Sequence, residues 1–596
     1  MGRGIILLAI LQTLLVASTC NNLTTLNSTP TVQLKHYSDV LANRSSNPNL
    51  VYHIVPHTHD DAGWLKTFDE YYYGLKSDNF NIECVKCILN ETYSILSSGK
   101  HRVFSYVEMS FFEKWYSNLT HERQQGVKDF VKNKQLFFPN AGWVMNDEAC
   151  AYYEDIIEQF TLGHRFVYQE FNFTPSVGWS VDPFGHSSTH AHLLAQMGMN
   201  LAFFDRIHYS DQRKRRAENN TEFYWMPYED FPEWGLVGRN NLLFYGGLSA
   251  EVGYQFKTIS WASFDKKTNS PAQALYWLND QADYYATDQV FFHIGSDFTF
   301  SKKGTELYED IEKFVVEVNA VVENSTGVAI LSAPDVYAEQ WYLDYARYPN
   351  LRLTIKKDDF FPYADAQDGA NYWTGYFSSR PTLKRKISES SWFLQTARKM
   401  AFGGGLVQAL GQKAATLKAF WELSDRAINK LERALAIAQH HDAVTGTAKK
   451  HVNLDYIKML NDGQKEAWEI MKLAGDSALA SRLKPSAVSE LKKLVSNAPS
   501  KNSEANRTLL KYFTCKDNTS SIECPFLTDT LSEISNTSLL LQIYNPGPNK
   551  YAAHRVKVPH SDIEGKFFFS DDFQLIFTRL RSSSRVIFRF CSCFPS

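Results

Sequence analysis

Hydrophobic and polar positions alternate in two ways along the first two thirds of the chain. Short runs rich in Val, Ile, Leu and Phe recur between longer amphipathic stretches from about Leu50 to Leu331. Such runs are typical of buried parallel strands, and the amphipathic stretches are typical of helices that cover a sheet. The pattern predicts an α/β domain of the seven-stranded parallel type, with strands at Val51–Val55, Val103–Val107, Val177–Val181, Leu201–Phe204, Leu242–Tyr245, Val290–Ile294 and Val328–Leu331.

The apolar spacing becomes helical after Pro381. Stretches rich in Ala, Leu, Lys and Glu at Lys384–Phe402, Ala414–His440 and Leu454–Leu473 predict three helices, which we expect to form a bundle. The following segment, Ser477–Arg507, is rich in Ser, Lys and Asn and is typical of a linker.

Short alternating runs such as Leu539–Tyr544 and Arg555–Val558 then predict the start of a β-sandwich domain. The closing segment, with arginines among Ser and Phe, shows no clean strand alternation, and the residues after Leu509 are too few for a complete sandwich. We therefore expect a truncated end. The predicted organisation is a signal peptide at 1–20, an α/β catalytic domain at 45–380, a helical domain at 381–475, a linker at 476–508 and an incomplete β domain at 509–596.

The N-terminus has the pattern of a secretory signal peptide. Arg3 precedes an apolar run, and small residues lead to Cys20. The run is too short to span a membrane, and no later stretch reaches 18 apolar residues. Many N-x-Ser/Thr sequons fit a chain that enters the secretory pathway, where its eight cysteines can pair. We favour a Cys515–Cys524 bridge and a structural role for Cys84 and Cys87.

The composition and net charge of the chain exclude several classes of protein. With 44% hydrophobic and 21% charged residues, the chain is in the ordinary globular range, which excludes a collagenous or wholly disordered protein. Its net charge of -3 provides no positive field for phosphates, so we expect no nucleic-acid partner.

The first motif with candidate chemistry follows the first predicted strand. It reads His57-Thr58-His59-Asp60-Asp61 and leads to Trp64. Imidazole and carboxylate groups that emerge from a buried strand are ligands for a borderline divalent metal such as zinc. A merely polar loop is the alternative.

Three further motifs place acids at the ends of apolar elements. They are Trp179-Ser-Val-Asp182-Pro-Phe184-Gly-His186, Phe292-His293-Ile-Gly295-Ser-Asp297-Phe298 and Gln439-His440-His441-Asp442. Taken alone, Asp182 could be a helix N-cap. Together the motifs provide a metal site and a pair of carboxylates, which favours a metal-assisted hydrolase.

These motifs resemble those of the glycoside hydrolase family 38 α-mannosidases, and His57–Gly74 is most similar to the lysosomal branch. The resemblance extends from roughly Leu50 to Tyr544. It implies that zinc is bound by His59, Asp61, Asp182 and His441. It also implies that Asp182 is the nucleophile and Asp297 the general acid/base. Trp64, Phe184, Arg206, Trp373 and Asp442 are implied to line the mannose subsite.

The implied activity is retaining, zinc-dependent and exo-acting. It would remove terminal α-D-mannose from N-linked glycans during glycoprotein catabolism, in the lysosome or after secretion. Such an enzyme needs an ionised nucleophile and a protonated acid, and phenylalanines beside Asp297 would favour its neutral form.

Two other functions stay open at this point. Family members continue into large β domains, so the chain could be a truncated, inactive isoform that keeps zinc or glycan binding. A metal-dependent amidohydrolase or deacetylase is the second alternative, because it also uses a His-x-His motif after a first strand. The sequence does not indicate the linkage preference or the oligomeric state.

Overall fold

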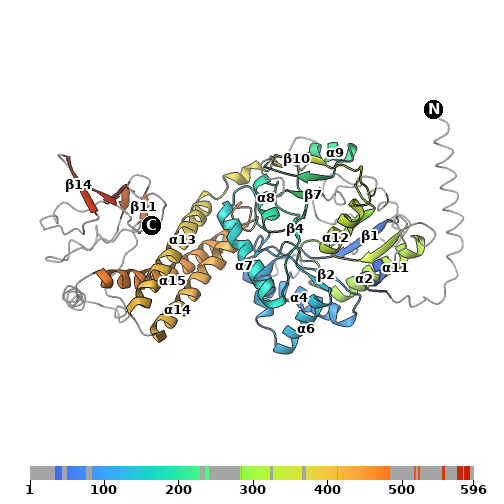
Figure 1. The fold of residues 1–596 in the computed structure, drawn as a ribbon, viewed down its shortest axis with the longest axis horizontal. Helices are drawn as coiled ribbons and strands as arrows, with labels where there is room; N and C mark the ends of the chain where they lie inside the picture. The colour runs from blue at the N-terminus through green and yellow to red at the C-terminus, as the bar shows by residue number, and fades with distance from the viewer. Residues whose placement is uncertain are drawn as a thin grey trace. The chain divides into compact units, whose positions relative to one another are not determined.

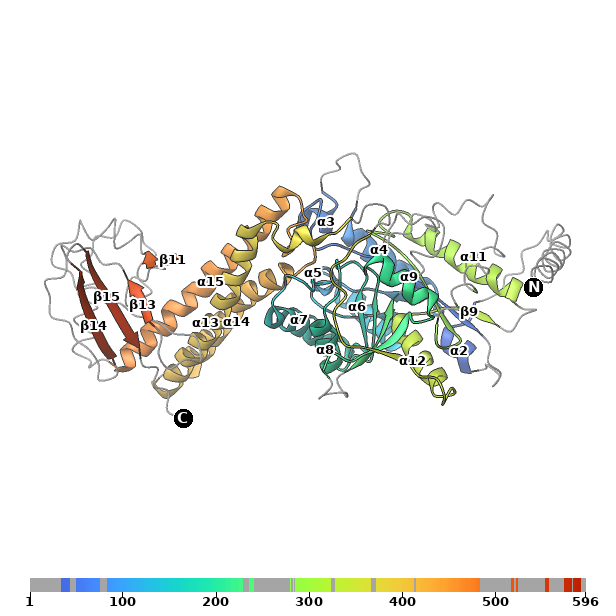
Figure 2. The same cartoon turned by 90° about the horizontal axis from the view of Figure 1, so that it is seen from above.

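The computed structural model describes residues 34–42, 50–75, 83–228, 235–240, 279, 282, 285–322, 327–365, 371–411 and 414–482, together with five short strands between 516 and 590. The predicted signal peptide, the strand at Leu242–Tyr245, the run at Leu539–Tyr544 and the Cys515–Cys524 bridge lie outside these residues. The chain divides into two compact units (Figures 1 and 2). The first takes in residues 1–60, 69–141 and 164–373, and the second takes in 61–68, 142–163 and 374–596.

The first unit is built on parallel strands. A fully buried strand, β1 (Val51–Pro56), lies between β8 (Gln289–Ile294) and β9 (Val328–Leu331), parallel to both. A five-stranded sheet has the order β10-β6-β7-β5-β4, and a parallel pair is formed by β2 and β3. These strands are β2 (Phe104–Ser105), β3 (Leu136–Phe137), β4 (Val177–Ser180), β5 (Leu201–Phe204), β6 (Glu222–Trp225), β7 (Leu236–Asn240) and β10 (Thr354–Lys356).

The sheet differs from the predicted one in its pairing. All predicted strands of this region that fall on described residues are present, but they are distributed among separate sheets, and β6 pairs with β7 antiparallel. Strand pairing depends on contacts between residues distant in sequence, so the local apolar pattern predicts where strands occur without predicting their neighbours.

Helices cover these sheets: α11 packs on β9, and α12 packs on β8 and β4 (Figure 1). Helix α12 begins with Pro334, whose fixed φ suits a first turn, and α6 is capped by Thr120, which accepts from the Arg123 amide. The helices are α2 (Tyr37–Ala42), α3 (Phe68–Tyr73), α4 (Val85–Ser98), α5 (Met109–Tyr116), α6 (His121–Lys132), α7 (Tyr153–Phe171), α8 (Ser188–Gln196), α9 (Tyr209–Ala217), α11 (Gly304–Val322) and α12 (Pro334–Tyr345).

An aromatic core joins the strands that carry the candidate motifs. Phe203 stacks on Phe291 with ring centroids 4.4 Å apart, and Trp179 and Tyr337 meet the same rings. Each aromatic side chain buries a large apolar area, so this cluster fixes β4, β5, β8 and α12 relative to one another. It provides a rigid base for the loops at the carboxyl ends of these strands.

The second unit contains three long helices that run side by side and contact one another pairwise: α13 (Pro381–Gly411), α14 (Ala414–Ile437) and α15 (Lys450–Arg482) (Figure 1). All three predicted helices are present. Arg398 of α13 pairs with both Glu158 and Glu432, which ties α13 to α7 and α14. Helix α15 continues to Arg482, into the segment expected to be a linker.

Five short strands end the described chain in the order β11-β12-β13-β15-β14. They are β11 (Lys516–Asn518), β12 (Ser521–Glu523), β13 (Ala553–Val556), β14 (Phe573–Leu580) and β15 (Ser583–Phe590). Strands β14 and β15 pair antiparallel (Figure 2), although the sequence analysis found no clean strand alternation in this closing segment.

Candidate functional site

The loop after β1 carries the first predicted metal ligands. Because β1 is buried between two parallel strands, the chain leaves it inside the protein, and His59 and Asp61 are only 1% and 2% exposed. The His59 amide donates to the Ser296 carbonyl at 3.2 Å, and His59 in turn accepts from the Phe298 amide at 2.9 Å. The loop after β8, which contains Asp297, is therefore held alongside His59.

Asp182 and Arg206 follow the neighbouring parallel strands β4 and β5. The register pairs Ser180 with Phe204, so each of the two polar residues lies two positions beyond a paired strand end. The Arg206 guanidinium donates to Asp182 Oδ1 through Nε at 2.7 Å and lies 2.6 Å from it through Nη2. The other oxygen, Oδ2, lies 3.4 Å from His59 Nε2.

His441 and Asp61 form a matching pair within the second unit. His441 follows α14 and is fully buried, and its Nδ1 lies 2.8 Å from the carbonyl oxygen of Met145. A carbonyl only accepts, so Nδ1 carries the proton and Nε2 has its lone pair available. Nε2 lies 3.2 Å from Asp61 Oδ1. Both histidines therefore present Nε2 to a carboxylate.

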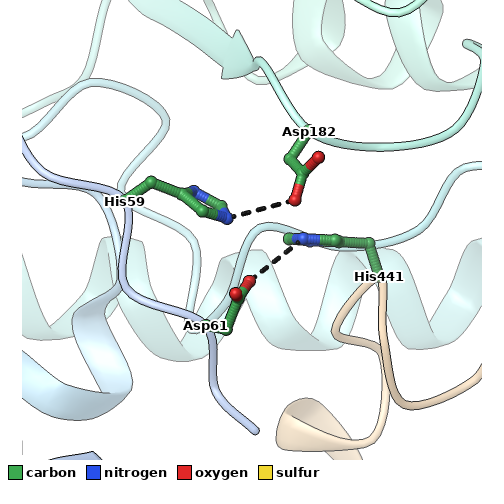
Figure 3. Close-up of side chains that lie close together, drawn as sticks. All are labelled: His59, Asp61, Asp182 and His441. Carbon is green, nitrogen blue, oxygen red and sulfur yellow. Dashed lines mark ion pairs between the residues drawn. The ribbon is translucent and has the colours of Figure 1, made fainter. Parts of the chain in front are cut away.

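Four buried side chains make up the candidate metal centre: His59, Asp61, Asp182 and His441. Each offers one ligand atom, and these atoms lie within 4.8 Å of one another. Figure 3 shows the imidazoles and carboxylates pointing toward one another. Two buried carboxylates beside each other need a positive partner, and two imidazole nitrogens with two carboxylate oxygens suit a divalent metal. The residues present therefore fit a metal ion.

A second buried group shares two of these residues. It consists of Asp61, His440, His441 and Asp442. His440 Nε2 lies 3.5 Å from Asp61 and 3.6 Å from Asp442, and the Thr447 hydroxyl donates to Asp442. Asp442 is therefore held within the His440-His441-Asp442 turn, next to the candidate ligands.

The loop that carries Asp297 has an unusual backbone. Gly295 has φ of +152°, and an added Cβ would lie 1.8 Å from the His57 carbonyl oxygen. Phe298 has a positive φ of 51° and stacks on Tyr71 at 4.2 Å. Backbone in these regions persists only where its surroundings impose it, which is frequent at functional sites. Asp297 itself is only partly buried.

The residues expected to line a sugar subsite occur in two groups. In the first unit, the rings of Phe184 and Trp373 lie 4.9 Å apart, and the Arg206 guanidinium lies 5.0 Å from the Trp373 ring. Trp64 and Asp442 belong to the second unit, where the Trp64 carbonyl accepts from the Lys449 amide at 3.0 Å.

Sequence reasoning missed several buried polar residues behind the metal loop. The Tyr106 hydroxyl donates to Asp60 Oδ2 at 2.9 Å, and Glu108 lies 3.6 Å from His59 Nδ1. His57 Nε2 lies 2.8 Å from His293 Nδ1. Burial lowers the pKa of His57 to about 3 and that of His293 well below its usual range, so both rings stay neutral. Tyr106 and Glu108 stand at the end of a predicted strand, the same signal that identified Asp182.

Cys84 and Cys87 form a disulfide at the start of α4. Among the described helices, none has a stretch long and apolar enough to cross a membrane.

Two protein-family models match consecutive segments of this chain. Residues 49–366 match the glycosyl hydrolases family 38 N-terminal domain, and residues 371–477 match the alpha mannosidase middle domain. Human lysosomal alpha-mannosidase is 37% identical over 435 residues, which cover 70% of this chain and 40% of the relative. A probable alpha-mannosidase of Arabidopsis thaliana is 35% identical over 434 residues, covering 70% of this chain and 39% of the relative.

The chain thus spans about two fifths of the length of these relatives. An alpha-mannosidase structure from Enterococcus faecalis V583 has a TM-score of 0.53 at 14% identity, covering 91% of this chain and 53% of that one, which supports the fold. Because the first family model matches more than half of the chain, the chain belongs to glycosyl hydrolase family 38.

Proposed function

We propose that this protein is a retaining, zinc-dependent, exo-acting α-mannosidase that removes terminal α-D-mannose from N-linked glycans during glycoprotein catabolism. The observation that carries the proposal is the buried group of His59, Asp61, Asp182 and His441 in a family 38 chain. The relatives named lysosomal alpha-mannosidase support the same activity and a lysosomal or secreted location.

In this proposal the four side chains hold zinc, the metal for which two imidazoles and two carboxylates are common ligands. A zinc ion bound there would contact adjacent sugar hydroxyls and favour the ionised form of Asp182. The Arg206 guanidinium acts in the same direction, because its two donors engage Asp182 Oδ1. The nucleophile would stay ionised at acidic pH.

Catalysis would then need two steps. An Asp182 oxygen forms a bond to the anomeric carbon while the glycosidic bond breaks, and Asp297 gives its proton to the departing oxygen. Water then attacks the anomeric carbon, Asp297 takes a proton from that water, and the bond to Asp182 breaks. The α-configuration is retained because each step inverts it. The β-bridge between His59 and Asp297 supports this assignment, because it holds the Asp297 loop beside His59, which faces Asp182.

The proposed mannose subsite consists of Trp64, Phe184, Arg206, Trp373 and Asp442. Aromatic faces suit the apolar face of a sugar ring, and a carboxylate accepts hydrogen bonds from sugar hydroxyls. The contact of Phe184 with Trp373 and the position of Asp442 beside His441 support this assignment.

We also propose that the chain is organised as a signal peptide at 1–20, a catalytic domain at 45–380, a three-helix bundle at 381–475, a linker at 476–508 and part of a β-sandwich at 509–596. The family models at 49–366 and 371–477 support the two central domains.

The experiment that tests the function follows hydrolysis of an α-mannoside by proton NMR, with an α-glucoside and an N-acetylated sugar as controls. We expect release of mannose that is first seen as the α-anomer, with no action on either control. First release of the β-anomer would overturn the retaining mechanism. Deacetylation without mannose release would favour an amidohydrolase, an alternative that the family match does not favour.

A further inference from the structure

Glu108 is a buried carboxylate directly behind a proposed metal ligand. It is 1% exposed, and its Oε1 lies 3.6 Å from Nδ1 of His59. On the other side of the same ring, Nε2 lies 3.4 Å from Asp182 Oδ2. The imidazole is therefore placed between two carboxylates, one at each nitrogen.

The position of Glu108 at the start of α5 explains why its carboxylate can face His59. Glu108 is the N-cap residue of α5, where its carbonyl accepts from the amides of Phe111 and Phe112 at 3.2 Å. Its side chain makes no capping hydrogen bond. Asp, Asn, Ser and Thr side chains at an N-cap commonly accept from the amides of their own helix. Here the backbone anchors the residue while the carboxylate faces His59.

A neighbouring contact fixes the same loop. Tyr106 donates its hydroxyl to Asp60 Oδ2 at 2.9 Å, and Asp60 also accepts from the Thr58 hydroxyl at 3.0 Å. The segment between β2 and α5 therefore reaches the β1 loop at two successive residues, Asp60 through Tyr106 and His59 through Glu108. Tyr106 contacts Asp60, which is not a proposed metal ligand, whereas Glu108 contacts the ring of His59, which is.

We propose that Glu108 is a positioning residue for the metal centre: it attracts the Nδ1 proton of His59, so that Nε2 presents its lone pair to the metal. His441 has a related arrangement at hydrogen-bond distance, because the Met145 carbonyl lies 2.8 Å from its Nδ1, whereas Glu108 lies 3.6 Å from Nδ1 of His59. An acceptor behind a ligating imidazole fixes the tautomer and ring orientation and makes the ligand more basic. A carboxylate does this more strongly than a carbonyl, because it is charged.

The inference rests on the metal centre of the proposed function, and its test measures metal binding without substrate. The full chain is stripped of metal with a chelator, and zinc affinity is measured by competition with a chromophoric chelator. The variants are Glu108→Gln, which keeps an acceptor oxygen without the charge, and Glu108→Ala. Glu312→Gln is the matched control, because Glu312 is a carboxylate of the same unit that pairs with Arg102 and His101.

We expect Glu108→Ala to weaken zinc binding by roughly 10- to 100-fold, Glu108→Gln to lie between it and the wild type, and Glu312→Gln to leave the affinity unchanged. Unfolding temperatures of the metal-free proteins separate this effect from a loss of structure. Wild-type zinc affinity in a folded Glu108→Ala variant overturns the inference alone. Failure of the wild-type chain to bind zinc overturns it together with the metal centre.

Discussion

Arg206 and Asp182 are joined through a single carboxylate oxygen: Nε and Nη2 of Arg206 lie 2.7 and 2.6 Å from Asp182 Oδ1, which leaves Oδ2 facing His59. The guanidinium is itself surrounded by the rings of Phe184, Tyr363 and Trp373. Arg206 therefore orients the proposed nucleophile, a role beyond the sugar contact expected from the sequence.

Arg206→Lys should reduce kcat/KM for an α-mannoside by roughly 10- to 100-fold. Lysine cannot donate from two fixed positions, and one lost hydrogen bond to a charged group costs about 1.5–3 kcal/mol. Steady-state kinetics provide the measurement. Arg215→Lys is a suitable control, since Arg215 stacks on Phe223 and Phe360. Equal losses in the two variants would contradict a specific role for Arg206.

Removal of metal should lower the unfolding temperature. A ligand that binds only the folded chain adds to its stability, by about 4 kcal/mol at 1,000 times its Kd. We expect zinc to raise the unfolding temperature of chelator-treated wild type and to have no such effect on His441→Ala. The exposed His451 provides the matched control, and His451→Ala should respond as the wild type does. A full zinc response in His441→Ala would rule out His441 as a ligand.

Gly295→Ala should damage the protein much more than Gly198→Ala. Both glycines have positive φ, so alanine is strained at either position by about 1–2 kcal/mol. Only at Gly295 would the new Cβ meet a backbone atom, the His57 carbonyl oxygen, whereas nothing lies within 4 Å at Gly198. Denaturant unfolding should show an extra loss of about 1–3 kcal/mol for Gly295→Ala. Similar losses would mean that the Asp297 loop shifts freely away from His57.

Asp155 should make stability depend on pH. Burial raises the pKa of Asp155 to about 6, against about 3.9 in an unfolded chain. The folded state therefore binds more protons between these values, so the stabilisation is complete below about pH 4 and is lost as the pH rises through about 6. Asp155→Asn removes this dependence and can still accept from the Ser391 hydroxyl at 2.6 Å.

Relative to wild type, Asp155→Asn should gain up to about 3 kcal/mol of stability between pH 4 and 7. Unfolding free energies across this range provide the measurement, and Asp129→Asn on the exposed face of α6 controls for loss of a negative charge. A constant difference between Asp155→Asn and wild type would show that Asp155 is ionised throughout.

Local pattern was sufficient to predict the positions of the three long helices and of six of the ten described strands β1–β10, while β3, β6, β7 and β10 were not predicted. It also identified His59, Asp61 and Asp182 as candidate functional residues, because each follows a predicted strand of a parallel sheet. Functional side chains gather at the carboxyl ends of such strands. The resemblance to family 38 was needed to choose His441 over His440, since both lie in one turn and both are buried.

The features that escaped prediction depend on contacts distant in sequence. Glu108 is separated from His59 in the sequence by α3, α4 and β2, and nothing in the motif around it indicates that its carboxylate reaches an imidazole. The antiparallel pairing of β6 with β7 likewise depends on side chains far apart along the chain. These relationships emerge only when the chain is folded.

Metal-dependent hydrolysis of an α-mannoside tests the central claim most directly. A chromogenic α-mannoside is offered at acidic pH to the purified chain before chelation, after chelation and after zinc is restored, with Asp182→Asn in parallel. We predict turnover that disappears with the chelator, returns with zinc and is absent in Asp182→Asn. A folded chain that binds zinc stoichiometrically but releases no product would contradict it.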